Sequence, residues 1–217
     1  LEFDGTANSF VKVNNSSRLS FPSSSFSWEA WVKSDGGGTI ITKGDGVNAA
    51  DTEYLISIKH YPNPTVFFNF RGQLKNTAAT FDVGVWTHIA LVISDFNNKF
   101  KVYINGKFVR EDNLPTGTYA TNRNFNLYFG KQGSAAAYNF TGALDEVRLY
   151  NRALSPIEIK EHFYGFYTET GEGFPKLAEG TYLPGQTLSV WPSWSVLGAA
   201  VGRGLPVDPI NKLNQAG

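Results

Sequence analysis

The chain has 217 residues, and its 19 lysines and arginines balance 19 aspartates and glutamates, so its formal net charge is zero. Proteins bind nucleic acids and anionic membranes largely through positive charge. The chain has no basic excess and no basic run, so neither is expected as a partner. The absence of cysteine excludes disulfides and cysteine-type zinc sites, and no apolar run approaches the ~20 residues that cross a bilayer.

Residues 1–150 predict a succession of short strands, because Phe, Tyr, Trp, Val and Ile recur at every second position between turn signals. In YINGKFV, Asn105-Gly106 lies between two alternating segments and predicts a type I′ hairpin turn. A second turn is expected around Asn97-Asn98. With no helix expected before residue 155, the pattern predicts an all-β fold, a two-sheet antiparallel jelly-roll sandwich. The expected strands are LEFDG, SFVKVN, SFSWEAWVKS, GTIITKG, EYLISIKHY, TVFFNFRG, WTHIALVISD, KFKVYINGKFVRED, FNLYFGKQ and GALDEVRLYN.

The segment GALDEVRLYNRALSPIEIKEHF, residues 142–163, predicts a strand followed by one short helix. The helix is expected near 155–163, since Ser155 suits the N-cap, Pro156 the first helical position and Glu158 a capping box. We expect its apolar residues to close one end of the sandwich. These residues are Ile157, Ile159 and Phe163.

Two adjacent carboxylates, Asp145 and Glu146, interrupt the apolar pattern of the strand before this helix. Successive side chains of a strand point to opposite faces, so one of the two is expected to face inward. A buried carboxylate needs a cationic partner, a cage of hydrogen bonds or a metal ion. The residues alone leave these alternatives open.

The character of the sequence changes after Gly165. Residues 166–217 are rich in Gly and Pro and show little strand alternation, yet they retain apolar side chains such as Trp191 and Trp194. A disordered linker would have few such residues. We therefore predict a domain over 1–165 and an irregular C-terminal appendage over 166–217 that packs on the sandwich or on a neighbour.

Residues 1–164 resemble the laminin-G-like jelly rolls of the concanavalin A-like superfamily, because several segments follow one another in the order and spacing of that family. These segments are LEFDGTANSFVKV, FSWEAWVKS, IITKGDG, WTHIALVIS, KVYINGKFV, NLYFGK and FTGALDEVRLYNRALSPIEIKEHF. The appendage resembles segments of exported surface or pilin-like proteins of uncultivated bacteria, which implies an extracellular or cell-surface location. The superfamily includes lectins, carbohydrate-binding modules, adhesion domains, pentraxins and glucanases, so the resemblance specifies the fold more closely than the function.

The resemblance also implies a structural calcium ion that ties the first strand to the last long one. Its ligands here would be Asp4, backbone carbonyls around Gly5, Asn8 and Asp145. The alternative without metal is that Asp145 caps backbone N–H groups or pairs with Arg148. Glu146 is expected to face solvent or to pair with an arginine, Arg148 or Arg152.

A second acidic stretch, residues 43–54, lacks the spacing and the closing bidentate glutamate of an EF-hand calcium loop. It is interpreted as a solvated loop on the rim where laminin-G-like domains often bind partners. Its polar members are Asp45, Asn48, Asp51 and Glu53.

No catalytic pattern is present in the sequence. Laminarinase-type glucanases of the superfamily place two carboxylates on one face of a strand through a Glu-x-Asp-x-x-Glu arrangement. Here the acids in REDN, residues 110–113, and in LDEV are adjacent, so they point to opposite faces. His88 lies in a core strand pattern and is expected to be a packed histidine. We therefore predict that the protein is not an enzyme.

A carbohydrate-binding module would use exposed aromatic rings as stacking platforms and polar side chains to recognise hydroxyl groups. The candidate ligand-binding residues are three loop tyrosines and two polar residues near the end of FFNFRGQ, which could lie on the concave face: Tyr61, Tyr119, Tyr138, Asn69 and Arg71. The tryptophans Trp28, Trp31 and Trp86 are expected in the core.

Two functions are consistent with these observations. The first is a non-catalytic binding or adhesion module of an exported surface protein, recognising a glycan or a cell-surface protein through the loop rim or the concave face. The second is a structural spacer, or a subunit of a surface filament, that self-associates through the appendage.

Overall fold

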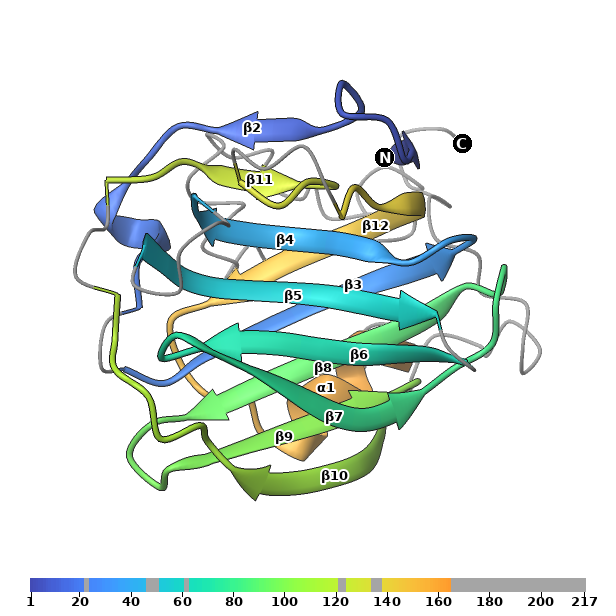
Figure 1. Cartoon of the computed structure of the whole chain (residues 1–217). Coiled ribbons are helices and arrows are strands. Elements are labelled where there is room, and N and C mark those ends of the chain that lie inside the picture. The colour runs from blue at the N-terminus through green and yellow to red at the C-terminus, as the bar shows by residue number, and fades with distance from the viewer. Residues whose placement is uncertain (22–23, 46–50, 61–62, 121–123, 134–137, 165–217) are drawn as a thin grey trace, which may run out of the picture.

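Two six-stranded antiparallel sheets pack face to face in the computed structural model of the protein, as the strand pattern predicts (Figure 1). The structure describes residues 1–21, 24–45, 51–60, 63–120, 124–133 and 138–164. The first sheet has the strand order β1-β12-β3-β8-β9-β10, and the second has the order β2-β11-β4-β5-β6-β7. The prediction of a jelly-roll sandwich is therefore confirmed. The appendage predicted for 166–217 lies outside the described residues.

The strands have the following bounds. The first sheet contains β1 (Glu2–Asp4), β12 (Thr141–Tyr150), β3 (Phe26–Ser34), β8 (Thr87–Ser94), β9 (Lys99–Ile104) and β10 (Lys107–Asn113). The second contains β2 (Val11–Val13), β11 (Leu127–Phe129), β4 (Gly38–Gly44), β5 (Thr52–His60), β6 (Pro64–Phe70) and β7 (Gln73–Thr80). A single 3-10 turn, η1 (Ser17–Leu19), follows β2.

The core lies between the two sheets and is built from alternate residues of the facing strands. Trp28 of β3 is fully buried there, and the rings of Phe68 in β6 and Phe100 in β9 meet edge to face at 4.8 Å. Trp31 is buried as well, but on the outer side of its sheet, where its ring stacks on Phe163 at 5.6 Å. Trp86, expected in the core, is only half-buried because it precedes β8.

Both predicted hairpin turns are present. Asn105 and Gly106 have φ values of 50° and 70°, as a type I′ turn between β9 and β10 requires. Asn98, with φ 52°, ends the turn between β8 and β9. Gly106 is needed for a second reason, since a Cβ at this position would lie 2.9 Å from the Cβ of Phe163.

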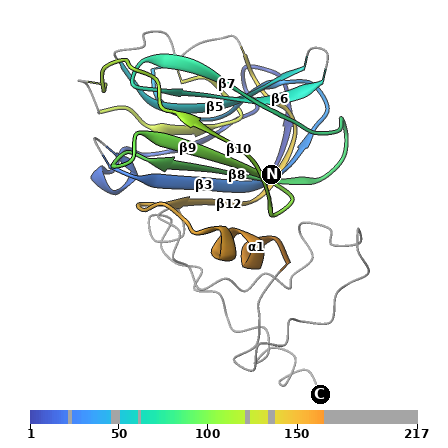
Figure 2. The ribbon, with the colours of Figure 1, turned by 90° about the horizontal axis from the view of Figure 1, so that it is seen from below.

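The predicted helix is α1 (Pro156–Tyr164), and its capping box is formed. The Glu158 N–H donates to Ser155 Oγ at 3.2 Å, and the Ser155 N–H donates to Glu158 Oε2 at 2.8 Å. The expectation that the helix closes an end of the sandwich is wrong, because α1 lies against the outer face of the first sheet (Figure 2). Ile159 is therefore buried, whereas Ile157 is 70% exposed. Within the described ranges, no helix has the length and apolar character needed to span a membrane.

Candidate functional site

The two sheets differ in what lies on their outer faces. On the first sheet, Ile159 and Leu154 pack against Val92, Tyr103 and Tyr150, and all of these side chains are buried. No described helix covers the outer face of the second sheet, which lies on the opposite side of the molecule (Figure 2). This second outer face, called the open face below, is therefore the larger surface on which strand side chains can reach a ligand.

The register of the second sheet decides which residues form the open face. Val66, Phe68 and Phe70 of β6 point into the core, so Phe67 and Asn69 between them point outward. Strand pairing then aligns outward side chains in two rows across the sheet. One row is Lys12, Tyr128, Thr42, Leu55, Asn69 and Leu74, and the other is Thr39, Ser57, Phe67 and Asn76.

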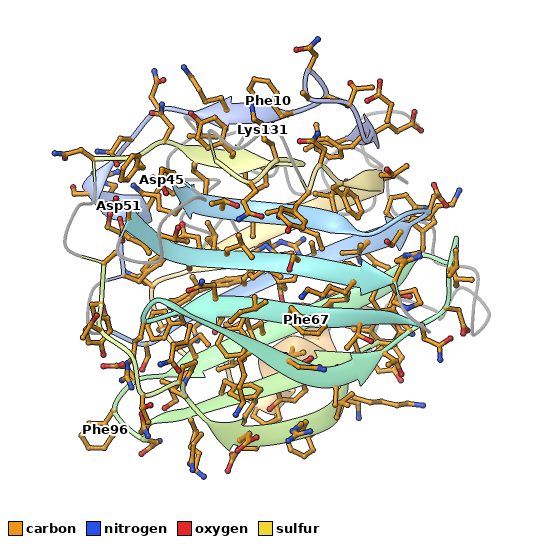
Figure 3. The ribbon with its side chains drawn as sticks, in the orientation of Figure 1. Phe10, Asp45, Asp51, Phe67, Phe96 and Lys131 are labelled. Atoms are coloured by element: carbon orange, nitrogen blue, oxygen red, sulfur yellow. The ribbon has the colours of Figure 1, made fainter. Side chains whose placement is uncertain are left out.

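Phe67 lies in the middle of the β6 part of the open face (Figure 3), and Asn69 is the next outward residue of the same strand. The ammonium group of Lys59 lies 4.6 Å from the centre of the Phe67 ring. The Asn69 Oδ1 atom is buried and has no hydrogen-bond partner. A hydrogen bond from a donor such as a sugar hydroxyl or a water molecule to this acceptor lowers the free energy, because the acceptor is otherwise unsatisfied. The site thus combines an aromatic ring, a cation and an unused amide acceptor.

A second aromatic group lies at the β2–β11 side of the open face. Phe10, directly before β2, is 37% exposed, and its ring lies 6.1 Å from that of Tyr128. Lys131 places its ammonium group 4.6 Å from the centre of the Phe10 ring (Figure 3). Lys12 is exposed and pairs in register with Tyr128. The same combination of ring and lysine therefore occurs at both sides of the open face.

In the middle of the open face, the chain just before β12 pairs with β4 along the edge that β11 leaves unpaired. The Thr39 N–H donates to the Tyr138 carbonyl at 2.7 Å, and Thr39 also forms a bridge with Asn139. Thr39 and Thr42 of β4 are buried, and neither side-chain hydroxyl has a hydrogen-bond partner. Leu55 and Ser57 of β5 are buried as well, so the accessible parts of the two rows lie on β6–β7 and on β2–β11.

Two of the five predicted ligand-binding residues, Arg71 and Tyr119, come together but contact other protein groups. Arg71 donates to Asp95 Oδ1 at 2.7 Å and to the Tyr119 hydroxyl at 2.9 Å. The Tyr119 hydroxyl in turn donates to Asp95 Oδ1 at 2.5 Å. Arg71 also reaches Asn98 Oδ1 at 2.9 Å, so it joins the β6–β7 turn to the β8–β9 turn. This cluster connects the two sheets at one end of the sandwich.

The other predicted ligand-binding residues are more widely placed. Asn69 lies on the open face, as described above. Tyr138 is 69% exposed with φ 62°, and its backbone carbonyl binds β4. Tyr61 lies outside the described residues. The two described tyrosines lie against different elements, Tyr119 against Arg71 and Tyr138 against β4.

The predicted metal ligands of the first turn lie together, but their side chains have other roles. The Thr6 N–H donates to Asp4 Oδ1 at 2.8 Å, and the Asp4 N–H donates to Ser9 Oγ at 3.1 Å. The first of these hydrogen bonds, to Thr6, is the main cause of a lowered pKa for Asp4. Gly5 has φ 79° and lies against Thr141. Asn8 belongs to the same turn, and the hydrogen bond from Thr6 engages one of the two carboxylate oxygens of Asp4.

Asp145 is not brought to this turn. Asp4 pairs with Thr141, and Asp145 lies four residues further along β12, roughly 13 Å away at ~3.3 Å per residue. Its Oδ1 accepts from the Glu146 N–H at 2.9 Å, as in the alternative without metal. Glu146 pairs with Arg148, as expected. Within the described part of the chain, no group of three or more Asp, Glu, His or Cys residues could hold a metal ion, and calcium stays a prediction.

The acidic stretch 43–54 forms the ends of β4 and β5. The Asp45 N–H donates to the Asp51 carbonyl at 3.2 Å, which closes the connection between the two strands. Glu53 is almost fully buried, accepts from Ser20 Oγ at 2.9 Å and lies 3.5 Å from the ammonium of Lys43. Asn48 lies outside the described residues. Glu53 is thus a structural acid and not part of a solvated loop.

The most deeply buried carboxylate is one that the sequence reasoning missed, Glu29 of β3. It lies on the outer side of the first sheet, beneath α1, and is fully buried. Tyr150 donates to it at 2.9 Å, Arg148 donates at 3.2 Å, and His162 Nδ1 lies 3.0 Å away. The sequence signal for a buried acid was the position of Glu29 within the apolar segment FSWEAWV, but its partners Arg148, Tyr150 and His162 come from β12 and α1.

The charges of this cluster follow from burial and from its neighbours. Burial raises the pKa of Glu29, but the hydrogen bond from His162 and the charge of Arg148 outweigh it and lower that pKa to about 2. Burial lowers the pKa of His88 to about 4, although Glu29 opposes this effect. His88 is fully buried, neither ring nitrogen has a hydrogen-bond partner, and its Nε2 lies 3.8 Å from Glu29. The packed role predicted for His88 is confirmed.

Comparison with known proteins agrees with this fold. A laminin G family model, described as the concanavalin A-like lectin/glucanases superfamily, matches residues 4–160. No match was found among curated protein sequences.

Three solved structures show the likeness in detail. The heptameric SAP-like pentraxin from Limulus polyphemus is 15% identical with a TM-score of 0.56, over 73% of this chain and 78% of that one. Domain 4 of AbnA, a GH43 extracellular arabinanase from Geobacillus stearothermophilus solved with arabinotriose, is 22% identical with a TM-score of 0.53, over 72% and 73%. The binding domain of botulinum neurotoxin serotype G is 14% identical with a TM-score of 0.58, over 75% of this chain but 42% of that one. At these identities the likeness shows the fold alone.

Proposed function

The chain belongs to the concanavalin A-like lectin/glucanases superfamily, and we propose that it is a non-catalytic, extracellular module that binds a glycan through its open face. The observation that carries the proposal is the group of Phe67, Lys59 and Asn69 on that face, with a half-buried ring and an unused amide acceptor. Sugars present apolar ring faces and hydroxyl donors, which suit such a surface. The arabinotriose bound to AbnA domain 4 and the extracellular location of AbnA support the proposal by analogy.

A glycan fits this group better than a flat protein partner does. The neighbours of Phe67 in its row are the polar residues Ser57 and Asn76, and Leu74, which pairs with Asn69, is 49% exposed, so the apolar area is small. Protein interfaces usually present a larger apolar centre. A non-catalytic role is supported by the sequence, in which the acids of REDN are adjacent and so point to opposite faces of their strand. A spacer or filament role through 166–217 rests on residues outside the described ranges and stays a prediction.

The test is binding of the full chain to an array of neutral and acidic oligosaccharides, followed by calorimetric titration of those that bind. Phe67→Ala and Asn69→Ala are expected to weaken binding at least tenfold without loss of the folded state. Phe96→Ala is the matched control, because Phe96 is 95% exposed on the β8–β9 turn of the first sheet. Equal affinities of the Phe67 and Phe96 variants, or no glycan binding at all, would refute the proposal.

A further inference from the structure

We propose that the glycan bound by the open face is anionic, and that Lys59 and Lys131 receive its carboxylate or sulfate groups. This inference rests on the proposed function and adds the chemical class of the ligand. It starts from a difference between the lysines of this face and the other cations that lie over aromatic rings.

Most cations that lie over rings in the described part of the chain also have an acidic partner. Arg71 lies over Phe70 and Tyr119 and pairs with Asp95 at 2.7 Å. Lys75 lies over Phe100 and pairs with Asp112 at 3.4 Å, and Arg152 lies over Tyr150 and pairs with Glu158 at 2.5 Å. In each case a carboxylate of the protein neutralises the cation.

Lys59 and Lys131 are the exceptions. Each lies 4.6 Å from the centre of a phenylalanine ring, and neither has an ion pair with any residue that the structure describes. Both belong to the open face. Lys59 of β5 pairs in register with Thr65 of β6, and Lys131 lies beside Phe10 at the β2–β11 side (Figure 3). Among the described residues, the cations that lie over an aromatic ring without an acidic partner are thus found on the surface proposed to bind glycan.

A ring of this kind orients an ammonium group without neutralising it. The attraction between an exposed ammonium and an aromatic face is worth about 0.5–1 kcal/mol, which favours one position of a flexible side chain. The N–H donors that point away from the ring stay available for an anionic oxygen, which forms the stronger, charge-assisted kind of hydrogen bond. A sugar that carries a carboxylate or sulfate offers that oxygen beside an apolar ring face.

The surrounding charges favour the same ligand. Lys12 is exposed beside Tyr128 and adds a third positive charge at the Phe10 side. Glu53 is already engaged by Lys43, and Asp45 and Asp51 lie at the β4–β5 connection, away from Phe67 (Figure 3). The open face is therefore locally positive although the whole chain has no net charge.

The spacing of the two lysine–phenylalanine pairs indicates a chain of sugars. Phe10 adjoins β2 and Phe67 lies in β6, with β11, β4 and β5 between them. Four steps of ~4.8 Å between neighbouring strands place the pairs roughly 19 Å apart. One sugar can contact only one pair, so an acidic oligosaccharide or polymer that passes over the buried Thr42 and Leu55 to reach both pairs is expected to bind more tightly than its monosaccharide.

The experiment compares three probes by calorimetric titration at low and high sodium chloride: oligogalacturonides, a sulfated oligosaccharide and a neutral arabino-oligosaccharide. The wild type is expected to prefer an anionic probe, and Lys59→Gln with Lys131→Gln is expected to weaken that binding at least tenfold. The matched control is Lys107→Gln with Lys160→Gln, which removes two exposed lysines outside the open face and leaves the same net charge. Equal thermal midpoints of both double variants show that folding is retained.

The outcomes separate this inference from the proposed function. Tighter binding of the oligogalacturonide identifies a carboxylate ligand, and tighter binding of the sulfated probe identifies a sulfate ligand. If the neutral probe binds as tightly as both, or if the control variant loses as much affinity as the Lys59 and Lys131 variant, the inference is overturned. Continued sensitivity to Phe67→Ala would then leave the proposed function standing, whereas failure of every probe would reject both.

Discussion

His162 of α1 lies 3.0 Å from the carboxylate of Glu29 in β3, so the helix is fastened to its sheet through a fully buried acid. Arg148 and Tyr150 of β12 reach the same carboxylate from the neighbouring strand. A group with this many partners holds three elements in one arrangement, β3, β12 and α1. Its removal should therefore affect the whole fold and not the helix alone.

Glu29→Ala is expected to lower the free energy of unfolding by about 3–5 kcal/mol, because it leaves the buried guanidinium of Arg148 without this partner. Urea unfolding followed by tryptophan fluorescence measures the change. Glu111→Ala provides the comparison, since Glu111 pairs with Lys101 at 3.3 Å where both side chains are 39% exposed. That substitution is expected to cost about 1 kcal/mol or less. Similar losses in the two variants would contradict the structural role of Glu29.

As the pH is lowered from neutral, the first loss of stability is expected to come from protonation of the buried His88. The pKa of His88 is lowered from 6.5 to about 4, so the folded state disfavours the proton that the unfolded state binds. Stability is therefore complete above pH 6.5 and falls as the pH decreases from 6.5 toward 4. The pKa of Glu29 is lowered from 4.5 to about 2, so its contribution is lost as the pH falls from 4.5 toward 2.

His88→Phe should separate these two ranges. Neither ring nitrogen of His88 has a hydrogen-bond partner, and the ring already packs against Trp31 and Phe163, so a phenyl ring forfeits no hydrogen bond. Denaturant titrations between pH 4 and 8 are expected to show a flatter profile between pH 4.5 and 6.5 in this variant. A profile unchanged from wild type would show that another group causes the decrease.

Gly106→Ala should weaken the attachment of the helix as well as strain the turn. Gly106 has φ 70°, and an added Cβ would lie 2.9 Å from the Cβ of Phe163 in α1. Gly84 has φ 69°, and an added Cβ there would lie 3.6 Å from the nearest atom. Gly84→Ala is thus expected to cost about 1–2 kcal/mol from backbone strain alone, and Gly106→Ala distinctly more. Thermal unfolding of the two variants measures the difference. Equal shifts of the midpoint would show that the Phe163 side chain moves away from the added Cβ at no cost.

Tyr119→Phe should lower stability without changing glycan affinity. It removes the hydroxyl that donates to Asp95 at 2.5 Å and accepts from Arg71 at 2.9 Å. The loss is expected to be about 1–2 kcal/mol in urea unfolding. Weaker glycan binding at unchanged stability would instead restore Arg71 and Tyr119 as ligand-binding residues.

Calcium binding can be tested by thermal unfolding with added calcium and with EGTA. The separation of Asp4 and Asp145 by roughly 13 Å along the strands is too large for one ion with ligand distances of ~2.3–2.6 Å. Any stabilisation by calcium is therefore expected to be lost in Asp4→Ala and kept in Asp145→Ala. Loss of the response in Asp145→Ala would support the four-residue site that the family resemblance implies.

The sequence patterns predicted the sandwich and the helix well because both depend on local chemistry. Alternation in TVFFNF correctly indicates which side chains are internal, and the same alternation places Phe67 and Asn69 on the outside. The capping box of Ser155 and Glu158 formed as expected. These features need no knowledge of distant partners.

The candidate site was less predictable because it depends on which strands become neighbours. Arg71 and Tyr119 looked available in the sequence, but Asp95, contributed by another turn, binds both. Phe10 and Lys131 lie 121 positions apart, and only the pairing of β2 with β11 brings them together. The partners of Glu29 come from β12 and α1, about 120–130 positions later, which no local pattern reveals.

The pairing of the earliest strands with the latest has a consequence for how the chain folds. The backbone carbonyl of Leu1 accepts from the Leu144 N–H, and β3 is completed on one side only by β12. A topology dominated by such distant pairings has a high contact order and folds on a timescale of about milliseconds to seconds, because long loops must close before the contacts form. During synthesis, β3 must wait for about 120 further residues before its second neighbour exists, so one edge of this strand stays unpaired until β12 has been made.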